Sequence, residues 1–191
     1  LQSKIEEMLR AFPTDSAAVV LDPRTGEVLA LASNRVFDPN DFIPPINKPK
    51  AREYMQNEGR VLRSIAFQEQ YPLGSVFKIT TATAALENRH ITGTSTIECT
   101  GHFRPTSRFY HCHGVHGALS LTPAMERSCN YFFYSCGEQL GIDGLKYWAL
   151  QFGYGDRTGL DIPGECKGEL EHRDPLSFAI GQAGFRASPL Q

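Results

Sequence analysis

The chain has 191 residues, of which 41% are hydrophobic and 21% are charged, with a formal net charge of −2. This composition can bury a core and excludes a disordered tail, and the balance of 19 basic against 21 acidic residues argues against nucleic acid or an anionic membrane as a partner. The sequence contains no apolar run near the roughly 20 residues that span a bilayer, and its start does not resemble a signal peptide, so we expect any membrane anchor to lie upstream of residue 1.

The first third of the chain predicts a helix, a hairpin and an irregular segment. Apolar residues recur at helical spacing over residues 4–12, with charged residues on the other face. Two apolar runs, 17–21 and 28–32, flank a turn that contains Pro and Gly, which is typical of a β-hairpin. Four prolines argue against regular structure over residues 34–71, where we expect a long excursion with one short helix.

The middle of the chain predicts a buried helix and then a loop. The Ala-rich segment that follows Gly74 predicts a buried helix that begins near Ser75. Residues 92–118 are rich in Gly, His and Cys and are expected to form a loop. Thr122 as N-cap and Pro123 as first helical residue predict the start of the next helix.

The last third predicts two more helices and then turns. Residues 131–140 and 145–152 are expected to be helical, and each run is followed by a glycine that can end a helix. The segment 159–165 is expected to consist of turns and extended chain.

Ser75 and Lys78 form the first candidate catalytic pair. Residues three apart on a helix share one face, so the two side chains can form a hydrogen bond. A serine hydroxyl is a weak nucleophile until a base takes its proton, and a lysine whose pKa is lowered by burial can be that base. The neighbours Val76, Phe77 and Ile79 favour such a buried setting. At a helix start, the backbone N–H of the serine also supplies half of an oxyanion hole.

Ser128 and Asn130 form a second candidate group. A hydroxyl and an amide at this spacing can relay a proton and hold a substrate amide. Taken alone, the first motif occurs often by chance and favours an N-cap followed by a solvated lysine. The second motif alone is typical of a polar turn between helices. Together, S-x-x-K followed by S-x-N is the order of the first two motifs of the penicillin-recognising serine enzymes.

Further segments resemble that family in the same order along the chain. Residues 20–30 resemble the opening strand pair of penicillin-binding protein transpeptidase domains, and residues 37–40 and 71–78 resemble the segments that lead to their nucleophile. The later matching segments are His116-Gly117, Phe152-Gly153, residues 158–165 and Ile180-Gly181-Gln182. The chain is most similar to class B, monofunctional transpeptidases of the cell-elongation type. This resemblance implies an α+β fold with a helix-rich subdomain and an N-terminal β-hairpin.

The resemblance implies a peptidoglycan D,D-transpeptidase. Ser75 would attack the penultimate D-Ala carbonyl of a stem peptide and expel the terminal D-Ala, and the acyl-enzyme would pass to an amine of a neighbouring stem. Lys78 would act as base for Ser75, Ser128 would help return the proton to the leaving group, and Asn130 would bind a substrate amide. β-Lactam antibiotics would acylate the same serine, and catalysis would need no cofactor. The implied place is the periplasmic face of the bacterial cytoplasmic membrane, with a cell-elongation glycosyltransferase as partner and a role in cell shape.

The family's third motif, K-[ST]-G, is not found in the sequence. Arg157-Thr158-Gly159 is similar, but its neighbours 161–165 place it in a different family element, and Lys167-Gly168 lacks the hydroxyl residue. We therefore expect residues 1–191 to be one transpeptidase domain without the third motif and the last strands, with the sheet represented only by its first hairpin. Losing one oxyanion donor costs on the order of 10²–10³ in rate, so we expect this chain alone to be inactive or to need a complementary fragment.

A possible metal site is indicated by one histidine and three cysteines, namely Cys99, Cys112, His116 and Cys129. Three thiolates and one imidazole are a tetrahedral zinc set of the structural type. Because Cys129 lies between Ser128 and Asn130, a zinc ion here would attach the His-rich loop to the second motif. The alternatives are a disulfide between the first two cysteines, expected in an oxidising compartment, and buried free thiols.

Two other functions are compatible with the same residues. A β-lactamase or a β-lactam sensor shares the first motif, but a hydrolase needs a group that activates water, and no carboxylate lies in a recognisable motif for that task. A catalytically incomplete scaffold of the cell-wall machinery would explain the missing third motif. Fast turnover of penicillin would indicate the hydrolase, and a long-lived acyl-enzyme would indicate the transpeptidase.

Overall fold

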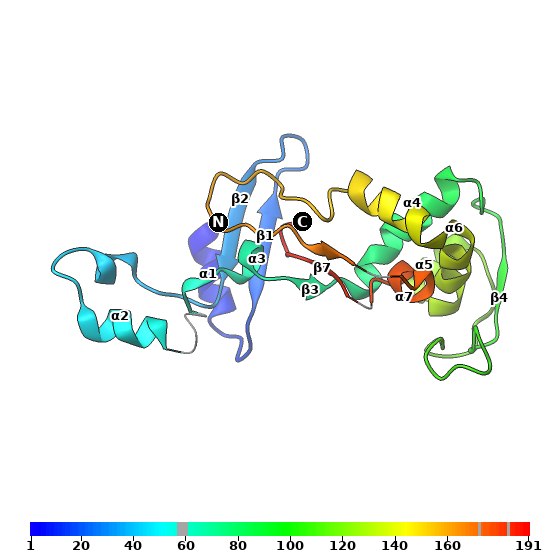
Figure 1. The fold of residues 1–191 in the computed structure, drawn as a ribbon, viewed down its shortest axis with the longest axis horizontal. Coiled ribbons are helices and arrows are strands. Elements are labelled where there is room, and N and C mark those ends of the chain that lie inside the picture. Colours follow the sequence, from blue (N-terminus) through cyan, green and yellow to red (C-terminus); the bar gives the residue numbers. More distant parts are fainter. Residues whose placement is uncertain (57–60, 172, 183) are drawn as a thin grey trace. The chain divides into compact units, whose positions relative to one another are not determined.

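The computed structural model describes residues 1–56, 61–171, 173–182 and 184–191. They form two compact units: unit 1 comprises residues 1–71, 158–166 and 188–191, and unit 2 comprises residues 72–157 and 167–187. Helices and short sheets together confirm the expected α+β class (Figure 1). Among the described residues, no helix combines the length and the apolar character that crossing a membrane requires.

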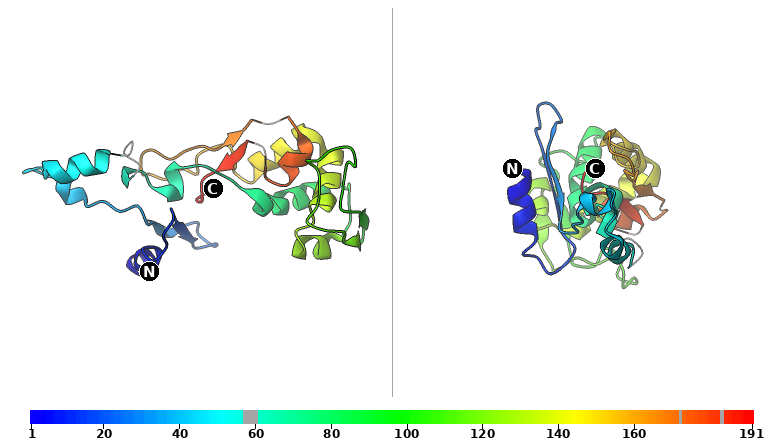
Figure 2. Two further views of the ribbon diagram at one scale, coloured as in Figure 1. Left: turned by 90° about the horizontal axis from the view of Figure 1, so that it is seen from below. Right: turned by 90° about the vertical axis from the view of Figure 1, so that its left-hand side faces the viewer.

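Unit 1 is built on the predicted hairpin. Strands β1 (Ala17–Leu21) and β2 (Val28–Ser33) pair antiparallel, with Ala17 opposite Ser33. Helix α1 (Gln2–Leu9) packs against strand β2 of this hairpin (Figures 1 and 2). The helix begins two residues earlier than expected. The side-chain amide of Gln2 accepts from Leu31 N–H at 2.8 Å and donates to Leu31 O at 3.0 Å, so it satisfies the backbone of β2 as another strand would.

Within the described residues, the excursion after the hairpin contains more than one short helical segment, so the expectation of one is wrong. Among them are η1 (Pro39–Phe42), α2 (Lys48–Met55) and α3 (Ile65–Gln68). Pro39 and Pro49 lie in the first turns of η1 and α2, where a missing N–H costs nothing, and therefore start helices instead of preventing them. Residues 57–60 of the expected excursion lie outside the described residues. Ala66 and Phe67 of α3 form a small core with Leu190, against which residues of the hairpin pack.

Unit 2 is a helical assembly. Its helices are η3 (Gly74–Phe77), α4 (Lys78–Glu87), α5 (Leu121–Glu126), α6 (Asn130–Gln151) and α7 (Pro175–Ala179). Both α4 and α7 pack against α6 (Figure 1). At Gly141, φ is 65° and ψ is 174°, so α6 is two helical segments joined at a break, close to the two helices that the sequence predicts. The N-cap position of α5 is Ser120, not Thr122, because the helix begins at Leu121.

Short strands in unit 2 overturn two expectations. β4 (Ile97–Cys99) pairs with β5 (Gly117–Leu119), within the region expected to be loop. β6 (Glu169–Leu170) pairs with β7 (Phe185–Ala187), in a sheet of order β3-β7-β6 whose first strand, β3 (Tyr71–Pro72), lies where unit 1 ends and unit 2 begins. The hairpin is therefore not the only sheet. Strands of two or three residues are too short for a period-two pattern to show in the sequence.

An aromatic cluster anchors the start of α4. The ring of Phe77 is fully buried and makes edge-to-face contacts with Phe178, Phe185 and Tyr154, at centroid distances of 5.4, 4.5 and 5.8 Å. Such pairs contribute about 0.5–1.5 kcal/mol each beyond the burial of their area. Because Phe77 lies between Ser75 and Lys78 in the chain, this packing fixes the backbone that carries both candidate catalytic residues.

Candidate active site

Ser75 and Lys78 lie at the junction between η3 and α4. In a 3₁₀ turn, residues i and i+3 point in nearly the same direction, so both side chains lie on one side of the turn. Ser75 is exposed, whereas Lys78 is only 1% exposed. The serine is thus open to a ligand while the lysine is largely removed from water.

The turn between α5 and α6 supplies Ser128 and Asn130. Ser128 has a φ of 49°, in the left-handed region that serine seldom adopts, and Asn130 is the first residue of α6. A left-handed residue other than glycine costs on the order of 1 kcal/mol and is kept where the surroundings require it. Here the conformation lets both the carbonyl and the hydroxyl of Ser128 accept hydrogen bonds from Lys78.

Three hydrogen bonds hold the ammonium group of Lys78. Its Nζ donates to Ser128 O at 2.8 Å, to Ser128 Oγ at 3.0 Å and to Asn130 Oδ1 at 2.7 Å. Ser128 Oγ in turn donates to Ser75 Oγ at 2.9 Å. Among the described residues, Lys78 therefore reaches Ser75 through Ser128, and the direct hydrogen bond expected from their i, i+3 spacing is not formed.

Burial lowers the pKa of Lys78 to about 8, and negative charge on the nearby Cys112 and Cys129 sulfurs opposes that shift. At pH 7 a group with this pKa is neutral in about a tenth of the molecules. The Phe133 ring lies 5.4 Å from Nζ and provides an aromatic face for the ammonium. Val76 and Ile79 are 63% and 54% exposed, so the expectation that they bury the lysine is wrong.

The proton relay has two consistent hydrogen-bond patterns. An ammonium uses its three donors on the three acceptors described above, and Ser128 then donates to Ser75. A neutral lysine keeps two donors and gains a lone pair, which can accept from Ser128 Oγ while Ser128 accepts from Ser75. The same atoms can thus carry a proton from Ser75 to Lys78.

The four predicted metal ligands also come together. Their ligand atoms, from Cys99, Cys112, His116 and Cys129, all lie within 4.8 Å of one another. His116 Nδ1 is 3.6 Å from Cys99 Sγ and 3.5 Å from Cys112 Sγ, and the Cys112 and Cys129 sulfurs are 3.7 Å apart. The edges of a tetrahedron with zinc bonds of about 2.3 Å to sulfur and 2.0–2.1 Å to nitrogen are roughly 3.5–3.8 Å long. The residues therefore fit zinc in type and number, and these three distances match the edges of such a tetrahedron.

The fold explains why these ligands meet. Pairing of β4 with β5 brings Cys99 beside His116, whose N–H donates to Cys99 O, and Cys112 N–H donates to Gly101 O at 2.7 Å. Burial raises the pKa of Cys129 to about 12. Burial also acts to raise the pKa of Cys112, but backbone N–H groups outweigh it and lower the pKa overall. All five cysteines are free thiols in the structure, which gives the disulfide alternative no support.

The two clusters share the turn at residues 128–130. Asn130 Nδ2 donates to His111 O at 3.3 Å, while its Oδ1 accepts from Lys78. His111 immediately precedes Cys112, so the ligand-bearing loop also holds the candidate substrate-binding amide. Neither the His111 carbonyl nor Phe133 was predicted from the sequence. The only available signal was the position of Phe133 one helical turn after Asn130.

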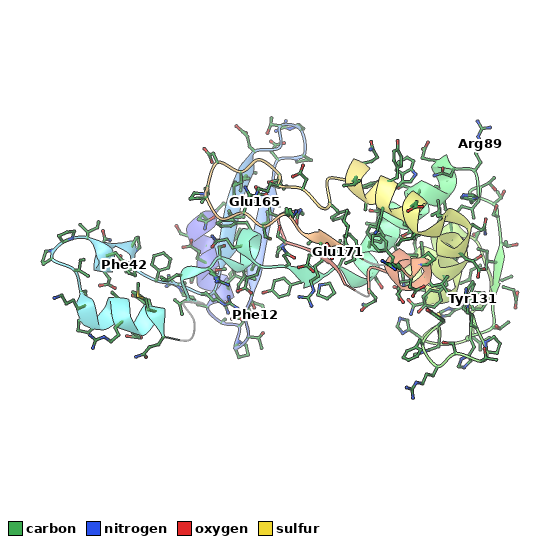
Figure 3. The ribbon with its side chains drawn as sticks, viewed as in Figure 1. Phe12, Phe42, Arg89, Tyr131, Glu165 and Glu171 are labelled. Carbon is green, nitrogen blue, oxygen red and sulfur yellow. The ribbon has the colours of Figure 1, made fainter. Side chains whose placement is uncertain are left out.

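The segment that resembles the third motif has another role in unit 1. Thr158 N–H and Oγ1 both donate to Glu165 Oε1 at 2.7 Å, and Glu165 is buried (Figure 3 labels this residue). Burial acts to raise the pKa of Glu165, but the Thr158 hydroxyl and nearby backbone N–H groups lower it overall. The hydroxyl of Thr158 is therefore used inside its own turn, which supports the interpretation of Arg157-Thr158-Gly159 as a different element.

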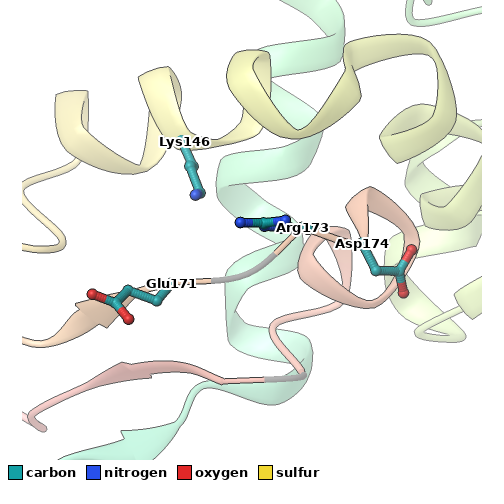
Figure 4. Close-up of a pocket in the computed structure, with 4 residues that line it drawn as sticks. All are labelled: Lys146, Glu171, Arg173 and Asp174. Carbon is teal, nitrogen blue, oxygen red and sulfur yellow. The ribbon is translucent and has the colours of Figure 1, made fainter.

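A separate hollow in unit 2 has a volume of about 800 Å³ and is lined by Lys146, Glu171, Arg173 and Asp174 (Figure 4). Figure 4 shows the Asp174 carboxylate turned away from Lys146. That carboxylate accepts from Leu176 N–H and Ser177 N–H, and so caps α7. It also accepts from the Tyr110 hydroxyl at 3.0 Å, so its place in the fold is structural.

Comparison with known proteins places the chain in a family of penicillin-binding protein transpeptidase domains. The model of the penicillin binding protein transpeptidase domain matches residues 16–191. Peptidoglycan D,D-transpeptidase MrdA of Acinetobacter baumannii is 34% identical over 193 residues, covering 92% of this chain and 29% of that protein. The chain spans about a third of the length of the curated relatives it matches.

Two solved structures show the same fold. PBP2 of Pseudomonas aeruginosa, in complex with WCK 5153, matches with a TM-score of 0.88 and 30% identity, covering 98% of this chain and 46% of that one. PBP2 of Helicobacter pylori, in complex with MreC, matches with a TM-score of 0.87 and 29% identity, covering 98% of this chain and 38% of that one.

Proposed function

Because the chain belongs to the penicillin-binding protein transpeptidase domain family, we propose that it carries the acylated serine of a peptidoglycan D,D-transpeptidase of the elongation type. The observation that supports this most directly is the chain of hydrogen bonds from Ser75 through Ser128 to the buried Lys78. A nucleophile, a proton path and a base of lowered pKa are the parts that acyl transfer to a serine requires.

In the first step, Ser75 Oγ attacks the penultimate D-Ala carbonyl of a stem peptide. Its proton passes through Ser128 Oγ to neutral Lys78, and the Ser75 backbone N–H stabilises the oxyanion. The bond to the terminal D-Ala then breaks, and the proton returns from Lys78 through Ser128 to the leaving amine. Asn130, whose side chain is fixed by Lys78 and His111, binds a substrate amide.

In the second step, an amine of a neighbouring stem attacks the acyl-enzyme. The same path takes the proton of the amine and returns it to Ser75 Oγ, which leaves as the cross-link forms. β-Lactams acylate Ser75 by the first step and open their ring, so they report on the site without needing the second stem peptide.

Labelling with a fluorescent penicillin, read by intact mass, tests this function. Two parent proteins are labelled: residues 1–191 alone, and the full-length natural protein that contains them. Each is compared with its own Ser75→Ala variant. A stable adduct on a parent chain and none on its variant is the expected result. Two results would overturn the assignment of Ser75: an adduct on a Ser75→Ala variant, or no adduct on either parent chain.

A β-lactam-hydrolysing domain is the second candidate. It would need a group beside Ser75 that activates water for deacylation. The described hydrogen-bond partners of Ser75 and Lys78 are Ser128 and Asn130, which carry hydroxyl, carbonyl and amide groups. These partners favour a long-lived acyl-enzyme, and release of the penicilloyl group within seconds would favour the hydrolase instead.

We also propose that Cys99, Cys112, His116 and Cys129 hold a structural zinc ion. The mutual distances of their ligand atoms support it. Bound zinc would cross-link the loop from Cys99 to His116 with the turn that carries Ser128 and Asn130. Metal analysis of reduced protein should find one zinc per chain in the parent and less in a Cys112→Ser variant. Protein that is folded, labelled by penicillin and free of zinc would contradict the proposal.

For the whole protein, we propose a place in the bacterial cell envelope, with its catalytic part on the periplasmic side. The MreC complex of the Helicobacter pylori relative supports partnership with an MreC-type protein, and we propose a cell-elongation glycosyltransferase as a further partner. Co-purification of the natural chain with the MreC-type protein and the elongation glycosyltransferase of the same organism tests this. Isolation of the chain without either partner from mildly solubilised membranes would contradict it.

A further inference from the structure

The residue before the nucleophile is held by the backbone of a second turn, formed by Ile180, Gly181 and Gln182 after α7. Gly74 N–H donates to Gly181 O at 2.9 Å. Gly181 has a φ of 70°, and a Cβ added there would lie 2.2 Å from Gly74 O and 2.8 Å from Gly74 N. Real Cβ atoms essentially never lie within 3.0 Å of a non-bonded heavy atom. The two peptide backbones therefore touch only because residue 181 has no side chain.

This second turn has a fixed place in unit 2. Thr81, on α4 and fully buried, donates from Oγ1 to Ala179 O at 2.8 Å, just before the turn. Gly137 of α6 approaches the other side of α7, where an added Cβ would lie 2.6 Å from both Pro175 O and Ala179 Cβ. Helix α7 is thus attached to α4 by a buried hydrogen bond and to α6 by close packing.

The position of the second turn determines that of the nucleophile. Gly74 has a φ of 55°, a conformation that its hydrogen bond to Gly181 O helps to hold. The Gly74 peptide leads directly into Ser75, so its orientation sets the direction of the Ser75 N–H and the place of its Oγ. In the mechanism above, these are the oxyanion donor and the attacking atom.

We propose that Gly181 is a positioning residue for the acylation of Ser75, with Thr81 as the anchor of its turn. This inference rests on the proposed function. A methyl group at residue 181 must push the Gly74 carbonyl by about 1 Å to reach an ordinary contact distance, and a misplacement of about 1 Å at a reacting group can cost about 10²-fold in rate. Binding of a β-lactam before acylation depends much less on this shift.

The test compares Gly181→Ala with Gly153→Ala. Gly153 also lies in unit 2 and has a φ of 87°, but nothing lies within 4 Å of its added Cβ, so that variant pays only the backbone cost. Stopped-flow labelling with a fluorescent penicillin separates the non-covalent Kd from the acylation rate constant. We expect Gly181→Ala to lower the rate constant by about 10²-fold with Kd nearly unchanged, and Gly153→Ala to leave both within about threefold.

A second pair of variants covers the case in which Gly181→Ala does not fold, as judged by thermal melting. Thr81→Val keeps the volume and removes the hydrogen bond to Ala179, and we expect it to lower the acylation rate constant by about 10-fold. Thr81→Ser retains the hydroxyl and should restore the rate. A Thr81→Val variant that is folded and is acylated at the parental rate would contradict the role of Thr81 as the anchor of the turn.

Backbone amide signals of Gly74 and Ser75 in an NMR spectrum provide a readout that does not need acylation. We expect them to move in Gly181→Ala and to stay in Gly153→Ala. If the parent is never acylated but the signals move, the proposed function fails while the positioning contact stands. If the signals stay and the acylation rate constant of Gly181→Ala is parental, the inference is wrong.

Discussion

The polar cluster of Ser75, Lys78, Ser128 and Asn130 and the cluster of Cys99, Cys112, His116 and Cys129 meet at the same turn but are held together differently. In the polar cluster, every donor of Lys78 has an oxygen acceptor within 3.0 Å. In the second cluster, the contacts among ligand atoms are weak sulfur contacts of 3.5 to 3.7 Å. The comparison shows that protein oxygens satisfy the donors of Lys78, whereas the ligand atoms of the cysteine–histidine cluster make only weak contacts with one another.

The largest effect should come from removing the cation of the polar cluster. Lys78→Met keeps most of the side-chain volume and removes the base, so acylation of Ser75 by penicillin should fall about 10²–10⁴-fold. Labelling kinetics of the variant measure this, and the far-ultraviolet circular dichroism spectrum confirms that it is folded. Acylation within 10-fold of the parent would show that Lys78 is not the base.

Metal removal should act on stability through the other cluster. A structural ion adds its binding free energy to the free energy of unfolding, and about 4 kcal/mol corresponds to a fall in Tm on the order of 10 °C for a chain of this size. We expect a strong chelator to lower the Tm of the parent and of Cys166→Ser, whose cysteine lies outside the cluster. A chelator should leave the Tm of Cys112→Ser nearly unchanged, and an equal fall there would contradict the site.

The pH profile of acylation tests the state of Lys78. Burial lowers the pKa of this lysine to about 8, and only the neutral amine can accept a proton. The acylation rate constant should therefore rise about tenfold per pH unit below pH 8 and level off above it, because the neutral fraction increases as pH rises through the pKa. A profile measured by stopped-flow labelling between pH 6 and pH 10 that is flat, or that falls with rising pH, would exclude this role.

The smallest predicted effect separates packing from electrostatics near Lys78. Phe133→Leu removes an aromatic face that favours the ammonium by about 0.5–2 kcal/mol. The midpoint of the pH profile should therefore move to lower pH by roughly 0.4–1.5 units. Phe132→Leu is the matched control, since Phe132 is buried next to it in the chain and has no described contact with the lysine. Equal midpoints of the pH profile in Phe133→Leu and Phe132→Leu would show that the Phe133 ring does not stabilise the charged form of Lys78.

The sequence by itself determined the residues of both clusters. S-x-x-K and S-x-N are short motifs whose members are neighbours in the chain. The set of three cysteines and one histidine followed from their spacing and from the place of Cys129 inside the second motif. The hairpin was equally accessible, because its two apolar runs and its turn form a local pattern. The expectation that residues 1–191 form one transpeptidase domain without the third motif stays a prediction.

Only the tertiary structure decided how these residues are connected. The path from Lys78 to Ser75 runs through Ser128, 50 residues away in the chain from the lysine. The backbone contact between Gly74 and Gly181, the strands of two or three residues and the anchor from Thr81 to Ala179 were likewise absent from the sequence-based expectations. The physical reason is that these are hydrogen bonds and close approaches between backbones far apart in sequence, and they leave no periodic signature in the side chains.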